Sequence, residues 1–129
     1  MTTESKACGC AAAPKLVFPC SGAADVGEIA DRAGRKLTRE GHGKMFCLAG
    51  VGGAIPNILT STRAADTILA IDGCPTNCVK ATLEKAGITH FQHLQLADLD
   101  LPKGKSPATE EAIGKVAAAG AALLSKPCC

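Results

Sequence analysis

Cysteine is the residue type in this chain whose number and spacing could do chemistry. The 129 residues include eight cysteines, and four of them lie beside short apolar segments: Cys20, Cys47, Cys74 and Cys78. Thiolates bind zinc and other soft metal ions, and they also act as nucleophiles. A chain of this length with 47% apolar residues can build a core without disulfides. The cysteines therefore indicate metal binding or redox chemistry more than a disulfide framework.

The composition disfavours several other functional classes. The formal net charge is only +2, Trp and Tyr are absent, and no block of like charges occurs. Stacking on nucleic-acid bases and attraction to phosphates or to a membrane surface are therefore poorly supported. No apolar segment has the length of a signal peptide or of a membrane span. We accordingly expect a cytoplasmic protein that binds neither nucleic acid nor membrane and keeps its thiols reduced.

The elements that must position the cysteines follow from the apolar patterns of the sequence. Short apolar segments predict strands at residues 15–19, 44–48, 67–71 and 89–96. Helical spacing predicts helices at 25–40, around 55–59, at 74–86 and at 106–125. Pro75 lies near the first position of the third of these helices, and Gly87 follows its end, as is common at helix termini.

This alternation of strands and helices predicts an α/β fold with a parallel sheet and helices on both faces. Because crossovers between parallel strands are right-handed, we expect a three-layer sandwich of flavodoxin-like or Rossmann-like type, with strand order 2-1-3-4. The sequence contains neither a repeat nor a linker. It predicts a single domain over residues 15–125, an N-terminal tail at 1–14 and a C-terminal Cys-Cys tail at 126–129.

Each of the first three predicted strands has a cysteine at or just beyond its end, namely Cys20, Cys47 and Cys74. With order 2-1-3 these strands are neighbours about 4.8 Å apart, and their carboxyl ends share one edge of the sheet. Cys78 lies one helical turn after Cys74, so both thiols can face one point. Helix N-termini would stabilise the thiolates. Four thiolates suit Zn²⁺, although Cu(I) or an iron–sulfur cluster also fits, and small buried thiols are the alternative.

Three motifs give the sequence a resemblance to a known family. They are PCSG at 19–22, CLAGVG at 47–52 and IDGCPTNC at 71–78. With these motifs the chain resembles the DGC-domain family, described as zinc-binding proteins and named for its Asp-Gly-Cys motif. The resemblance covers roughly residues 15–125 and implies that Cys20, Cys47, Cys74 and Cys78 bind Zn²⁺. It implies no particular biochemical activity.

Several weaker signals accompany the four cysteines. Asp72 could orient a metal ligand, or it could bond backbone N–H groups in a turn. The glycines at 50, 52 and 53 do not complete a nucleotide fingerprint, because Ile55 stands where the third glycine is required. Structural roles are expected for the three histidines, which are His42, His90 and His93. The remaining cysteines lie in the tails, where a second thiol site or independent flexible ends are both open: Cys8, Cys10, Cys128 and Cys129.

Three functions are compatible with such a thiolate site. A zinc carrier, sensor or buffer is favoured, because four thiolates leave the metal no open position for water. It would bind a metal ion and a protein partner for metal transfer. The alternatives are an enzyme of sulfur transfer or disulfide exchange that uses one of the cysteines, and a structural zinc that braces a partner-binding surface. We expect that the protein is not an enzyme.

Overall fold

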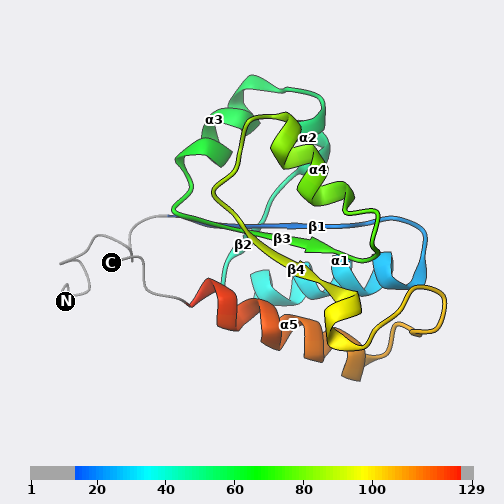
Figure 1. Ribbon diagram of the computed structural model, residues 1–129. Coiled ribbons are helices and arrows are strands. Elements are labelled where there is room, and N and C mark those ends of the chain that lie inside the picture. The colour runs from blue at the N-terminus through cyan, green and yellow to red at the C-terminus, as the bar shows by residue number, and fades with distance from the viewer. Residues whose placement is uncertain (1–13, 126–129) are drawn as a thin grey trace, which may run out of the picture.

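The computed structural model describes residues 14–125, and it has helices on both faces of a parallel sheet (Figure 1). The strands are β1 (Lys15–Pro19), β2 (Lys44–Met45), β3 (Thr67–Asp72) and β4 (Gln92–Gln95). The helices are α1 (Asp25–Arg39), α2 (Leu48–Gly52), α3 (Pro56–Ala64), α4 (Cys78–Lys85), the 3₁₀ helix η3 (Leu96–Leu99) and α5 (Glu110–Leu124). All strand pairs are parallel, and the order is β2-β1-β3-β4. The α/β fold and the 2-1-3-4 order expected from the sequence are therefore confirmed.

Successive side chains of the central strands point to opposite faces of the sheet, and they contribute to two aliphatic cores, one on each face. Helices α1 and α5 cover one face, and α2, α3 and α4 cover the other (Figure 1). On β1, Val17 belongs to the core under α1 and α5, while Leu16 and Phe18 belong to the opposite core. Each large side chain that is fully buried in this way stabilises the fold by about 1.5–3 kcal/mol. No helix in residues 14–125 is long and apolar enough to cross a membrane.

Two glycines let the start of α1 pack between the loops that carry cysteines. A Cβ on Gly27 would lie 2.3 Å from the carbonyl oxygen of Gly22, in the loop after β1. A Cβ on Gly73 would lie 2.8 Å from the carbonyl oxygen of Val26, on the other side. Neither separation is possible for a real side chain, so both positions require glycine. The α1 backbone thereby fixes the distance between the loop after β1 and the turn after β3.

Asp25 ties the segment before α5 to the same end of α1. Its carboxylate accepts hydrogen bonds from the backbone N–H of Gly104 and of Ser106, both at 2.9 Å, and from that of Val26 at 2.8 Å. These donors, Gly104 first, lower the pKa of Asp25. The loop that contains Lys103 is thus held at the edge of the sheet where the cysteines lie.

The element boundaries differ from the sequence prediction at several places. Strand β2 covers only Lys44–Met45, although the N–H of Phe46 still donates to the Val17 carbonyl at 2.9 Å. The segment after it forms two helices, because Pro56 lacks an N–H and begins a new helix. Helix α5 begins at Glu110, where Thr109 caps it by accepting from the N–H of Ala112. The tail cysteines lie outside the described residues.

Candidate functional site

The four cysteines of the motifs follow the carboxyl ends of three adjacent strands. Cys20 directly follows β1, Cys47 lies two residues beyond β2, and Cys74 lies two residues beyond β3. Cys78 is the first residue of α4. All four are free thiols; Cys20 and Cys74 are half-buried, and Cys47 and Cys78 are exposed. Three of these thiols therefore lie between a strand and the helix that follows it, and the fourth, Cys78, begins such a helix.

The side chains as they lie do not form a preassembled metal cluster. Within residues 14–125, no group of three or more Cys, His, Asp or Glu side chains is close enough to hold a metal ion. The donor chemistry fits a soft metal ion, since four thiols are present. Bringing them onto one ion would require Cys side chains to change rotamer or their loops to close.

Backbone N–H groups are directed at two of the sulfur atoms. The N–H of Gly22 donates to Cys20 Sγ at 3.4 Å, and the N–H of Gly50 donates to Cys47 Sγ at 3.3 Å. The second bond makes Cys47 the N-cap of α2. A Cβ on Gly50 would lie 2.7 Å from Ile58 Cγ1, so the glycine of the CLAGVG motif lets α2 pack on α3.

Among the described cysteines, Cys74 is the one whose surroundings lower the pKa of its thiol. The hydroxyl of Thr76 hydrogen-bonds the sulfur and lowers the pKa of Cys74, and the Thr76 backbone N–H adds to this effect. The positive charge of Lys103 lowers this pKa further, while partial burial and the negative charge of Asp72 oppose it. A thiolate is therefore easier to form at Cys74 than in an ordinary cysteine.

Asp72 is the buried carboxylate that holds the start of α4. It is 1% exposed and accepts hydrogen bonds from the N–H groups of Val79 at 2.8 Å and Lys80 at 3.1 Å. The sequence left two roles open for Asp72, orienting a metal ligand or bonding backbone N–H groups in a turn. The structure shows the second. The prediction that α4 begins near Pro75 is wrong, because the chain turns after Asp72 and Asn77 precedes the helix with a φ of 56°. Cys74 is therefore in the turn, and Cys78 alone is helical.

His93 is the partner of Asp72 that the sequence did not reveal. Its Nε2 lies 2.8 Å from Asp72 Oδ2. On the same strand, the Gln95 side-chain amide donates to Asn77 Oδ1. Ala70 pairs with His93 and Asp72 with Gln95, so these side chains share the face that α4 covers. His93 has a structural role, as expected, but its partner depends on a strand register that the sequence alone does not fix.

Comparisons with known proteins identify the family of the chain. The DGC domain family matches residues 16–119. A relative from Pseudomonas aeruginosa, the "Anaerobic and virulence modulator AnvM", is 39% identical over 88 residues, which cover 68% of this chain and 67% of the relative. No solved structure matches the chain. The three motifs at 19–22, 47–52 and 71–78 all lie within the matched region. The chain is thus a member of the DGC domain family.

Proposed function

We propose that Cys20, Cys47, Cys74 and Cys78 together bind one soft metal ion, with Zn²⁺ as the favoured metal, and that the protein acts in metal handling or sensing. The observation that carries the proposal is the position of the four thiols after three neighbouring parallel strands. This edge of an open α/β sheet is where such folds bind ligands. The hydrogen bonds from Thr76, which lower the pKa of Cys74, would stabilise a thiolate ligand at that position.

The donor set favours storage, transfer or sensing over hydrolysis. Four thiolates would complete the tetrahedral coordination of zinc and leave no position for a reactive water. In this arrangement, Cys20 and Cys74 would provide the half-buried side of the site, and Cys47 and Cys78 would turn in from the exposed side. Such thiols must remain reduced, so we place the protein in a reducing compartment such as the cytoplasm.

The name of the Pseudomonas aeruginosa relative favours a sensor over a carrier or buffer. Its name describes a modulator, which is a regulatory role. A metal site whose ligands are not preassembled within the described residues suits a sensor, because occupancy would change the conformation of the loops after β1, β2 and β3. A protein partner would read that change or exchange the metal.

The test is metal analysis of the protein purified without added metal, together with single cysteine variants. We expect about one zinc per chain, and loss of most of it in Cys78→Ser, with a lower melting temperature because binding is coupled to folding. Cys47→Ser should also lose metal, but in metal-free protein it should change the free energy of unfolding by less than about 0.5 kcal/mol, since Ser is a good N-cap. Full metal content in either variant would contradict the ligand set.

A thiol enzyme is the second candidate, favoured by the hydrogen bonds from Thr76 to the Cys74 sulfur. Such an enzyme would turn over sulfur donors or disulfides with Cys74 as nucleophile. Enzyme-like turnover that disappears in Cys74→Ser, in protein stripped of metal, would select this function. Absence of turnover together with stoichiometric metal would select the first.

A further inference from the structure

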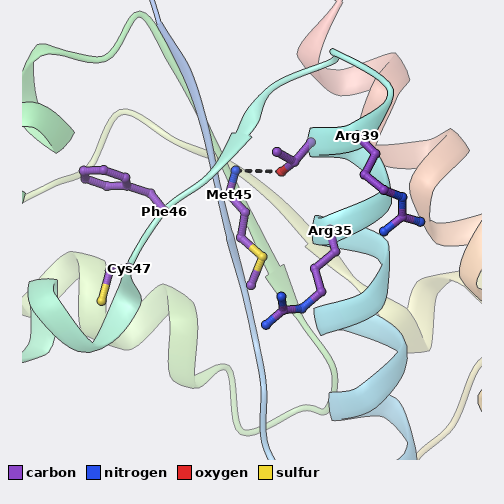
Figure 2. A pocket seen from close by; sticks show the side chains of 6 residues that line it. Arg35, Arg39, Met45, Phe46 and Cys47 are labelled. Carbon is purple, nitrogen blue, oxygen red and sulfur yellow. Dashed lines mark hydrogen bonds between the residues drawn. The ribbon is translucent and has the colours of Figure 1, made fainter.

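A groove beside Cys47 has features that the metal site does not use. It lies between α1 and the segment at and after β2, and it has a volume of about 610 Å³. We call it the α1–β2 groove; its lining residues are Arg35, Thr38, Arg39, Met45, Phe46 and Cys47. Figure 2 shows Arg35 and Arg39 extending from α1 and the Met45 side chain running beside Arg35. The volume is in the range of sites that bind small organic molecules.

The groove is positively charged on its α1 side. Arg35 and Arg39 are four residues apart, so they are neighbours on one side of the helix. Arg35 uses Nε to pair with Asp31 Oδ2 at 2.8 Å, which leaves its two Nη groups for another acceptor. Arg39 makes no ion pair within residues 14–125. Two like charges at this spacing repel each other slightly, and a bound anion would relieve that repulsion.

The other side of the groove is apolar and ends at a thiol. Met45 and Phe46 line it, and exposed Cys47 follows them. The N–H of Met45 is already bonded to Thr38 Oγ1 at 2.8 Å, shown by the dashed line in Figure 2, so this edge of β2 is not open for an added strand at that residue. A second hollow, lined in part by Ser21, Asp31 and Thr82, shares Arg35 and Cys47 with the groove and continues it past the thiol. The occupant that fits is a small molecule.

We propose that the α1–β2 groove binds a small disulfide that carries carboxylates, and that Cys47 exchanges with it. The carboxylates would lie on the guanidinium groups of Arg35 and Arg39. The Cys47 thiolate attacks one sulfur of the bound disulfide, so a bond forms between Cys47 Sγ and that sulfur while the original sulfur–sulfur bond breaks. The other half leaves as a thiolate, which takes up a proton. Cys47 is oxidised to a mixed disulfide, and the departing half is reduced to a thiol.

This exchange does not depend on the proposed metal site, but it would affect that site. A mixed disulfide at Cys47 removes one of the four thiolates that we assign to the metal. Binding of the anionic disulfide and binding of metal would then exclude each other. The exchange itself can be measured in metal-free protein, so its failure is distinguishable from a failure of the metal proposal.

The experiment measures adduct formation at each cysteine of the full, metal-free chain by peptide mass spectrometry. Trypsin should release Cys47 in the peptide 45–63 and Cys20 in the peptide 16–32, each as the sole cysteine of its peptide. The probes are glutathione disulfide, which carries carboxylates, and the uncharged 2-hydroxyethyl disulfide. At Cys20, the rate of adduct formation with glutathione disulfide relative to that with 2-hydroxyethyl disulfide reports the intrinsic reactivity of the two probes. This ratio is the internal reference.

At Cys47 we expect the rate of adduct formation to saturate as the concentration of glutathione disulfide rises. We define selectivity as the rate with glutathione disulfide divided by the rate with 2-hydroxyethyl disulfide, and we expect it to be about tenfold higher at Cys47 than at Cys20. Arg39→Gln and Arg35→Gln should each remove most of this selectivity and leave the rate with the uncharged disulfide within about twofold. Lys85→Gln, the same change of charge on α4 at the opposite face of the sheet, should have no effect. A rate that stays linear with probe concentration, or a selectivity that survives both arginine substitutions, would overturn the proposal.

Discussion

The turn after β3 and the segment after β2 both carry cysteines of the family motifs, yet they are held very differently. The turn is built on buried Asp72, which bonds two backbone N–H groups and His93. The segment after β2 contains no carboxylate: the N–H of Phe46 donates to the Val17 carbonyl, and the N–H of Gly50 donates to the sulfur of Cys47. The Cys47 thiol is exposed beside an open groove. From this difference we infer that the turn after β3 is the rigid side of the proposed site. The segment after β2 is its open side, where the Cys47 thiol can exchange ligands.

The largest expected effect concerns the rigid side. Asp72→Ala would leave the N–H groups of Val79 and Lys80 without their acceptor and His93 without its partner. We expect a loss of about 3 kcal/mol in the free energy of unfolding of the metal-free protein, measured with urea. Asp98→Ala, at an exposed position of η3, is the matched control and should change stability by less than about 0.5 kcal/mol. Equal effects of the two substitutions would remove the basis for calling this side rigid.

A pair of glycine substitutions tests the contact between α1 and the turn. Gly73→Ala places a Cβ 2.8 Å from the Val26 carbonyl oxygen, so the backbone must shift, and we expect a cost of about 2 kcal/mol. Gly114→Ala in α5 meets no atom within 4 Å and should instead stabilise the protein by about 0.5–1 kcal/mol, since alanine favours helices. Thermal unfolding of both variants measures the contrast. Equal shifts in melting temperature would contradict the close approach.

The sequence was sufficient for the architecture but not for the details of the rigid side. Strand and helix alternation with right-handed crossovers predicted the 2-1-3-4 sheet, because these rules depend on the whole chain and tolerate errors at element ends. The predicted start of α4 is wrong, because Pro75 resembles a first helical residue, while the carboxylate that accepts from the N–H groups of Val79 and Lys80 belongs to Asp72, six residues before Cys78. The bond from His93 to Asp72 depends on the register of β4 against β3, which local patterns do not encode.

The α1–β2 groove beside Cys47 could not be predicted from the sequence for a different reason. Arg35 and Arg39 lie on the polar side of an amphipathic helix, where charged residues usually need no explanation. Only the placement of β2 beside α1 shows that both line one groove with Cys47. The four thiols share an edge of the sheet without forming a cluster among the described residues, so neither the sequence pattern nor the fold brings them onto one metal ion.

The smallest expected effect is on the titration of Cys74, and its sign follows from the hydrogen bonds. Thr76 stabilises the thiolate, which lowers the pKa of Cys74 from its ordinary value of 9.0. Alkylation requires the thiolate, so the rate at Cys74 in metal-free protein should rise at a lower pH than for an ordinary thiol. Because the folded chain releases this proton first, the same shift makes stability increase with pH between the folded pKa of Cys74 and 9.0.

Thr76→Val removes the hydroxyl, the largest cause of the lowered pKa, and keeps the backbone N–H, so the pKa of Cys74 should rise. Alkylation rates at Cys74 as a function of pH, resolved by fragmentation of the peptide 64–80 that also contains Cys78, measure this change. Thr60→Val, at an exposed position of α3, should leave the profile unchanged. A profile that is the same with and without the Thr76 hydroxyl would mean that the turn after β3 shapes the backbone around Cys74 but does not prepare its sulfur. The contrast with the exposed thiol of Cys47 would then lie in rigidity alone.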